Sequence, residues 1–216
     1  MLNFTLLSLW MLSVAPSPLE VVVMTHSGLS QQKGDDESKK KKFKALLDGN
    51  IDLPFVIDEA LGAHRKDIKP EDLAHISEIF RDVLIESALE RTEDGGFGTL
   101  GCKGFERLDA WATVPCRLTL RDGTVFDVNV MLRYRKGWRM VDVVSKNTRL
   151  SDQYRGTVDE MWREEGVTGV IDRLEARLAK LRNNGKNTPE FMKQSILDEA
   201  EKDPANRYRT NVLKKK

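Results

Sequence analysis

The chain is poor in cysteine and in aromatic residues, and it has no excess of either charge. Its two cysteines are too few for a disulfide-rich scaffold or a four-cysteine zinc site. No apolar run reaches the roughly 20 residues that a membrane-spanning helix needs. Because 35 basic residues balance 34 acidic ones, a dedicated nucleic-acid-binding protein is not expected. What is present, 40% hydrophobic and 32% charged residues in a chain of 216, is the composition of an ordinary globular protein.

The N-terminal segment is the most biased part of the sequence. Phe4 to Val14 is an almost uncharged run, and small residues at Ser13 and Ala15 provide a pattern that signal peptidases cleave. We therefore predict a signal peptide over residues 1–18 and export of the rest. No Lys or Arg precedes the run, and Pro16 follows the cleavage position. A buried helix, a misassigned start codon and a retained lipid-surface anchor stay open as alternatives.

Apolar residues recur at steps of three and four in the first and last thirds of the chain, which predicts helices there. The predicted helices cover Leu19–His26, Ile51–Leu61, a long segment from Lys69 to the glycine-rich loop Thr92–Gly101, two segments after Asn147 that Gly166 separates, and a weaker one at Phe191–Ala200. Four lysines at 39–42 follow three acidic residues at 35–37. Acids suit a helix N-terminus, so we interpret this stretch as the solvated start of a helix rather than as a site for lipid or nucleic acid.

The middle of the chain changes to a period of two, which predicts strands. Three strands are expected at Val114–Leu120, Phe126–Tyr134 and Trp138–Val144, with turns at Asp122-Gly123 and Lys136-Gly137. The fold class is therefore predicted to be α+β: a curved antiparallel sheet in meander order, covered on one face by several helices, with an apolar cavity between. The predicted domain spans residues 19–182, and residues 183–216 are a polar C-terminal extension.

Sequence motifs for catalysis are weak. Gly96 to Gly101 matches the dinucleotide pattern GxGxxG, but a helix precedes it and a strand follows, the reverse of the order that phosphate binding requires. His64 and His75 lack metal-binding spacing. Asp142 shares the alternation of Trp138, so a buried acid is expected, and a structural hydrogen-bond acceptor is favoured over a general base.

The two cysteines, Cys102 and Cys116, flank Asp109 symmetrically. They oppose each other if residues 101–105 pair back on residues 113–118. In an exported protein this spacing permits a cross-strand disulfide, and two buried thiols remain an equal alternative.

Several segments together resemble one family. Gly137 to Val144, followed by Leu150 and then Tyr154-Arg155, is similar to the C-terminal signature of the MlaC-type, or toluene-tolerance, phospholipid-binding proteins. In that pattern a Gly-x-Trp-Lys-Val-x-Asp-Val strand precedes a turn and an Asn-Tyr-Arg helix start. Upstream, Leu61 to Arg65, Pro70-Glu71 and Phe80-Arg81 resemble the family's helical motifs. The resemblance covers roughly residues 19–181.

The resemblance implies a non-catalytic periplasmic carrier that shuttles phospholipid between inner and outer membranes. Phospholipid would be its bound ligand, with no metal, no other cofactor and no nucleic acid. Its implied partners are an inner-membrane ABC transporter with its substrate-binding domain and an outer-membrane lipoprotein complex. We predict that the acyl pocket is lined by Phe80, Leu84, Phe126, Val128, Val130, Leu132, Tyr134, Val158 and Trp162, with Arg149 and Arg155 near the headgroup. The alternatives are a protein-interaction adaptor and a cystatin-like cone-shaped enzyme that uses Asp142 and His64.

Overall fold

The computed structural model describes residues 15–93 and 96–184. Along the chain the elements are α1 (Pro18–Ser30), α2 (Asp36–Asn50), α3 (Leu53–Leu61), the short 3-10 helix η1 (Gly62–Asp67), α4 (Pro70–Glu93), β1 (Thr99–Cys102), β2 (Glu106–Leu108), β3 (Trp111–Thr119), β4 (Val125–Tyr134), β5 (Trp138–Ser145), β6 (Thr148–Arg149) and α5 (Leu150–Asn184). The apolar run at 4–14 and the predicted helix at Phe191–Ala200 lie outside the described residues. Among the described residues, no helix has the length and hydropathy needed to cross a bilayer.

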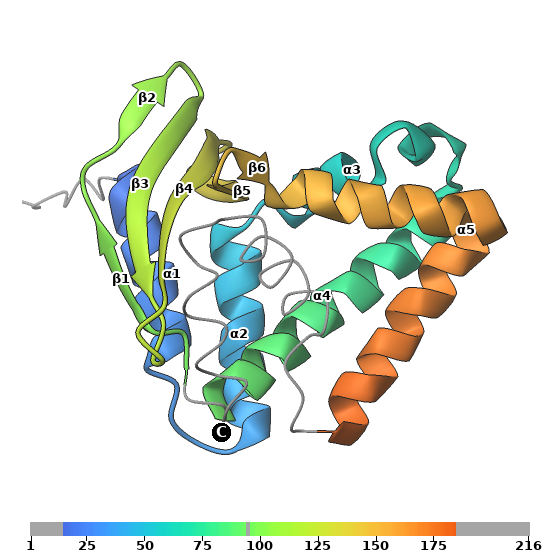
Figure 1. The fold of residues 1–216 in the computed structure, drawn as a ribbon, viewed down its shortest axis with the longest axis horizontal. Helices are drawn as coiled ribbons and strands as arrows, with labels where there is room; N and C mark the ends of the chain where they lie inside the picture. Colours follow the sequence, from blue (N-terminus) through green and yellow to red (C-terminus); the bar gives the residue numbers. More distant parts are fainter. Residues whose placement is uncertain (1–14, 94–95, 185–216) are drawn as a thin grey trace, which may run out of the picture.

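The sheet is antiparallel throughout its named strands, in the order β1-β3-β4-β5-β6, with β2 also paired to β3. Strands β3, β4 and β5 are the three that the alternation predicts, so the α+β class with an antiparallel meander is confirmed. Figure 1 shows the sheet at one side of the molecule and the bodies of α3, α4 and α5 at the other. The helices are not spread evenly over the sheet: α1 packs across β1, β3 and β5, whereas α2, α3 and α5 meet the sheet at its β5 side.

A β-bulge in β5 changes which side chains share a face. Leu132 pairs with Met140, but the preceding residue of β4, Met131, pairs with Asp142, so Val141 has no partner in β4. Directly paired residues lie on the same face, and one extra residue reverses the alternation. Asp142 therefore lies on the face opposite Met140, so the prediction that it shares the alternation of Trp138 is wrong, whereas its expected burial is confirmed.

The apolar face of the sheet is closed by helix α1. Val21 and Val22 of α1 are both 3% exposed and pack against the buried residues Val114, Val130 and Leu132. The helix begins with a capping box, in which the Ser17 hydroxyl accepts from the Glu20 N–H and the Glu20 carboxylate accepts from the Ser17 N–H. Helix α1 and strands β3, β4 and β5 thus form one hydrophobic core.

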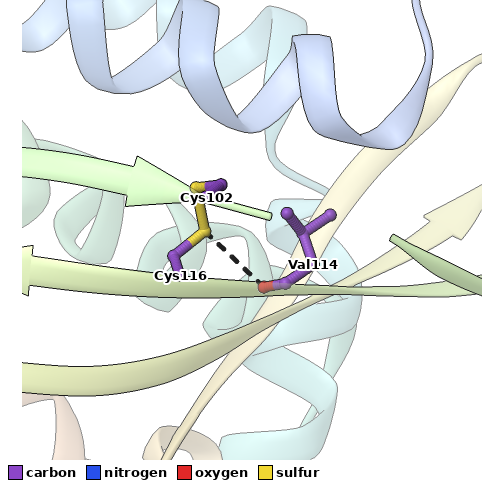
Figure 2. Close-up of a disulfide and its surroundings, with 3 residues drawn as sticks. All are labelled: Cys102, Val114 and Cys116. Atoms are coloured by element: carbon purple, nitrogen blue, oxygen red, sulfur yellow. Dashed lines mark hydrogen bonds between the residues drawn. A yellow bond between two sulfur atoms is a disulfide. The ribbon is translucent and has the colours of Figure 1, made fainter. Parts of the chain in front are cut away.

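Strand β1 is tied to β3 by a disulfide. Cys102 and Cys116 are direct partners in the register, and their sulfur atoms are 2.09 Å apart. Figure 2 shows the bond beside Val114, which is fully buried. Of the two alternatives that the sequence left open, the structure contains the disulfide.

The glycine motif is a connector between helix and strand. It lies between the end of α4 and β1, so it follows a helix and opens a strand. Gly98 has a φ of +71°, and a Cβ atom there would lie 2.2 Å from the carbonyl oxygen of Thr119. The glycine is needed for a close crossing of backbones. The order of elements, a helix before and a strand after, is the one predicted, and Gly98 has a packing role that the sequence did not indicate.

The helical body forms around α3, α4 and α5. Gly166 has a φ of +65° inside α5, where two helical halves meet. Figure 1 shows these halves at an angle, with α4 running in the angle between them. The buried residues Leu53, Ile57, Leu61, Ile76 and Val170 hold this part together. A third cluster, with Phe43 of α2 and Ile85 of α4 at its centre, joins α2 to α4.

The lysine-rich segment is the surface of α2. Lys39 lies 3.3 Å from Asp36, Lys40 lies 2.9 Å from Glu86 of α4, and the next residue of the buried face is Phe43. An amphipathic helix with intrahelical and interhelical ion pairs accounts for the lysines. The prediction that this segment is the solvated start of a helix is confirmed.

Candidate functional site

The predicted pocket residues on helices lie together. Phe80 and Leu84 of α4 and Val158 and Trp162 of α5 all pack against the core of the helical body. They belong to a set of half-buried apolar side chains around that core: Leu73, Phe80, Leu84, Val158, Met161, Trp162, Val167, Ile171 and Leu174. We call this set the helical apolar cluster. These side chains are neither fully buried nor fully exposed, so the cluster forms the partly accessible border of the helical core.

The predicted pocket residues on the sheet lie elsewhere. Val130 and Leu132 are buried in the core between α1 and the sheet, and Val128 packs against it. Phe126 is half-buried near the start of β4, and Tyr134 at its end is 46% exposed. The sheet residues and the helical apolar cluster therefore belong to different cores. The reason is that α1 occupies the sheet face that was expected to face the other helices.

Both predicted headgroup arginines are engaged in ion pairs. Arg149 lies 2.8 Å from Asp142 and 3.1 Å from Glu59. Arg155 donates two hydrogen bonds to the carbonyl oxygen of Glu59, at 3.0 and 2.8 Å, and its guanidinium lies 3.4 Å from Asp152. Acidic partners therefore balance both charges. Because Glu59 is on α3 and Arg155 is on α5, the network also joins α3 to the start of α5.

Asp142 is a fully used hydrogen-bond acceptor. Its side chain is 2% exposed and accepts from the N–H of Val143, the Nε of Arg149, and both the N–H and the hydroxyl of Ser151. Partial burial disfavours the charge of Arg149, but the hydrogen bond to Asp142 raises the pKa of that guanidinium. The carboxylate therefore faces a fixed cation and two donors of Ser151 at the start of α5. This geometry is that of the structural acceptor.

The second candidate of the enzyme alternative, His64, has other contacts. Its Nε2 lies 2.7 Å from Asp159, and its ring stacks on Trp162 at 4.5 Å between centroids. These contacts hold η1 against α5. In the two described ranges there is no group of three or more His, Cys, Asp or Glu side chains placed to hold a metal ion.

Tyr154 of α5 adds an aromatic ring next to the helical apolar cluster. Its ring meets Phe80 edge-on, with centroids 6.0 Å apart. Burial raises the pKa of the Tyr154 hydroxyl from 10.0 to about 12, against the opposing effect of Arg177. The neutral hydroxyl is therefore favoured in the folded protein.

This shift predicts a loss of stability at alkaline pH. Because the raised pKa belongs to the folded state, the contribution of Tyr154 is complete below about pH 10 and is lost as the pH rises toward about 12. Its size is about 2–3 kcal/mol, from about 1.4 kcal/mol per pKa unit. Urea unfolding of wild type and Tyr154→Phe measures it: the gap between the two proteins is expected to change by this amount across the window. A constant gap would contradict the assignment.

A polar cleft, which the sequence did not indicate, lies where α2 ends. Its volume is about 440 Å³, and its lining residues are Asp48, Ile51, Asp52, Leu53, Pro54, Arg81, Arg135, Lys136 and Arg139. They come from the α2–α3 junction, from α4 and from the β4–β5 turn. The basic residues Arg135, Lys136 and Arg139 are close together in the sequence. Taken alone, they are typical of a solvated face, so they did not predict a cleft.

The architecture and the sites define an α+β protein in which a sheet core and a separate helical apolar cluster meet at a basic cleft. The chain belongs to the MlaC family, because the model described as "MlaC protein" matches residues 20–176. The family predicted from the sequence is thereby confirmed.

A solved structure shares the fold. The phospholipid-binding protein from Ralstonia solanacearum, determined in complex with a phospholipid, aligns with a TM-score of 0.62 at 19% identity. The alignment covers 76% of this chain and 95% of the other. At this identity the likeness shows the fold. No curated protein sequence matches the chain.

Proposed function

We propose that this protein is a non-catalytic phospholipid carrier of the periplasm, which shuttles lipid between the inner and outer membranes. In this proposal residues 1–18 are a signal peptide and residues 19–182 are the lipid-binding domain. An inner-membrane ABC transporter with its substrate-binding domain and an outer-membrane lipoprotein complex are the exchange partners. Membership of the MlaC family is the observation that carries the proposal.

The acyl chains are assigned to the helical apolar cluster. Removing a lipid chain from a bilayer costs about 0.8 kcal/mol per CH₂ group, so a carrier must supply an equally apolar surface. Phe80, Leu84, Val158 and Trp162 supply such a surface from two helices. Val130 and Leu132, already packed against α1, are less suited to contact a ligand.

An oxidising compartment agrees with the disulfide. Structural disulfides persist in exported proteins and are rare in the cytosol. The Cys102–Cys116 bond supports export of this chain.

Native mass spectrometry of protein purified from bacterial cells tests the proposal. We expect a bound mass that corresponds to phospholipid, and we expect Leu84→Asn to lower its occupancy by about tenfold, because an acyl chain that covers the amide would leave it without hydrogen-bond partners. Val125→Asn is the matched control, since Val125 is 51% exposed at the start of β4. A wild-type protein without lipid, which also takes none from phospholipid vesicles, would instead favour the adaptor.

A further inference from the structure

The cleft between α2, α3, α4 and the β4–β5 turn carries more positive than negative charge. Four cations line it, Arg81, Arg135, Lys136 and Arg139, against the two acids Asp48 and Asp52. Lining residues of opposite charge normally compensate one another. Here the compensation is incomplete, and the remaining cations face an open volume.

Both acids already have closer partners. Asp48 lies 2.5 Å from Lys44 and 3.4 Å from Arg81. Asp52 lies 2.7 Å from Arg133, which is not among the lining residues, and 3.8 Å from Arg135. Asp52 also accepts from the N–H of Phe55 as the cap of α3. Two cations from outside the lining, Lys44 and Arg133, thus take the nearest positions on Asp48 and Asp52, the acids among the described lining residues.

Two cations of the lining have no carboxylate partner among the described residues. Arg139 donates to the backbone carbonyl of Asp48, a neutral acceptor. Lys136 has no ion pair or hydrogen bond in the described part of the chain, and Arg135 has only the long contact to Asp52, with 64% of its side chain exposed. Three basic side chains of the cleft, two on the β4–β5 turn and one at the start of β5, are therefore available to an anion. Such groups bind phosphate oxygens well, because arginine offers a planar pair of donors and lysine a concentrated charge.

The position of the cleft connects it to the apolar clusters. Leu53 belongs to the core of the helical body, and Ile51 packs on the cluster between α2 and α4. Ile51 also forms a bridge with Met140, which packs on the sheet core. The three apolar clusters thus approach one another at the cleft. An amphiphile whose chains lie among apolar side chains would have its polar end here, and a volume of about 440 Å³ is in the usual range for small-molecule sites.

We propose that this basic cleft binds a phosphate group, and that in the lipid-loaded protein this is the phosphate of the headgroup. The second part rests on the proposed carrier function. Arg135, Lys136 and Arg139 are the binding residues, and Arg149 and Arg155, whose charges are balanced by acids, are not. The same chemistry would accept a free phosphate ester, so the experiment has an arm for each source.

The test removes two cations from the cleft and leaves the shorter ion pairs of Asp48 with Lys44 and of Asp52 with Arg133 in place. The variant is Arg135→Gln with Lys136→Asn; asparagine suits position 136 because φ there is +55°. The matched control, Lys103→Gln with Arg121→Gln, removes the same charge from the β1–β2 loop and from the β3–β4 turn at the other end of β4. Each protein is equilibrated with vesicles that contain phosphatidylglycerol and diacylglycerol with the same acyl chains, and bound lipid is identified by native mass spectrometry. In parallel, glycerol 3-phosphate and inorganic phosphate are titrated calorimetrically.

In wild type and control, the occupancy by phosphatidylglycerol is expected to exceed that by diacylglycerol about tenfold. The cleft variant is expected to lose this preference while its diacylglycerol occupancy stays unchanged. Phosphate or glycerol 3-phosphate binding that disappears in the cleft variant alone identifies a free phosphate ester as the ligand. If no protein takes up lipid, the carrier function fails, and the titration alone decides whether the cleft binds phosphate. The inference is overturned if neither the lipid ratio nor phosphate binding differs between wild type and the cleft variant.

Discussion

Replacement of Asp142 by alanine is expected to lower the free energy of unfolding by about 3–5 kcal/mol, the usual cost of removing one partner from a buried ion pair. The side chain of Asp142 is 2% exposed, and its loss leaves the Nε of Arg149 and the hydroxyl of Ser151 without their acceptor, while Arg149 keeps its contact with Glu59. The start of α5 would then be held to β5 by fewer contacts. Urea unfolding followed by circular dichroism gives the measurement.

Two further variants separate this explanation from a general effect of mutation. Asp127→Ala removes a carboxylate from an exposed pair with Arg117 on the same sheet and is expected to leave the unfolding midpoint nearly unchanged. Adding Arg149→Met to Asp142→Ala should recover part of the lost stability, because the guanidinium whose Nε has lost its acceptor is removed. Equal midpoints for Asp142→Ala and wild type would show that the network is not structural.

Loss of the Cys102–Cys116 disulfide is expected to cost about 3 kcal/mol, from the loop-closure entropy of a loop of about 15 residues. The two residues are 14 positions apart and join β1 to β3. Without the bond, β1 keeps its pairing with β3, but the unfolded chain gains freedom. The fold is therefore expected to persist at lower stability.

Cys102→Ala with Cys116→Ala provides the comparison. A thiol reductant should lower the urea midpoint of the wild type to near that of the double variant and should leave the double variant unchanged. The opposite pattern, a wild-type midpoint that does not respond to reductant although the thiols are shown to be free, would contradict a stabilising bond.

The elements were predictable where one periodicity dominates. Strand β4 was expected at Phe126–Tyr134 and extends over Val125–Tyr134, and the long helix from Lys69 is α4, Pro70–Glu93. Each has one face that must be buried, and this produces a clear period of two or near 3.6. The short strand β2, with three exposed residues, has no such face and was not predicted as a strand.

The site was harder to predict, because it depends on which elements pack together. The bulge at Val141 reversed the face of Asp142, and no local pattern marks an unpaired valine. The position of α1 on the sheet separated Val130 and Leu132 from Phe80 and Trp162. The cleft draws its residues from three segments far apart in the chain, and such convergence is a property of the tertiary structure.

The closure of the sheet core by α1 has a consequence for biosynthesis. Val21 and Val22 are made first, but the strands that cover them end at Leu132 and beyond. Until those strands have emerged, two adjacent valines remain in contact with solvent or with a chaperone. The core therefore depends on contacts between residues far apart along the chain, a topology associated with slow folding. A ribosome paused before β4 is synthesised would carry a nascent chain in which Val21 and Val22 are still exposed.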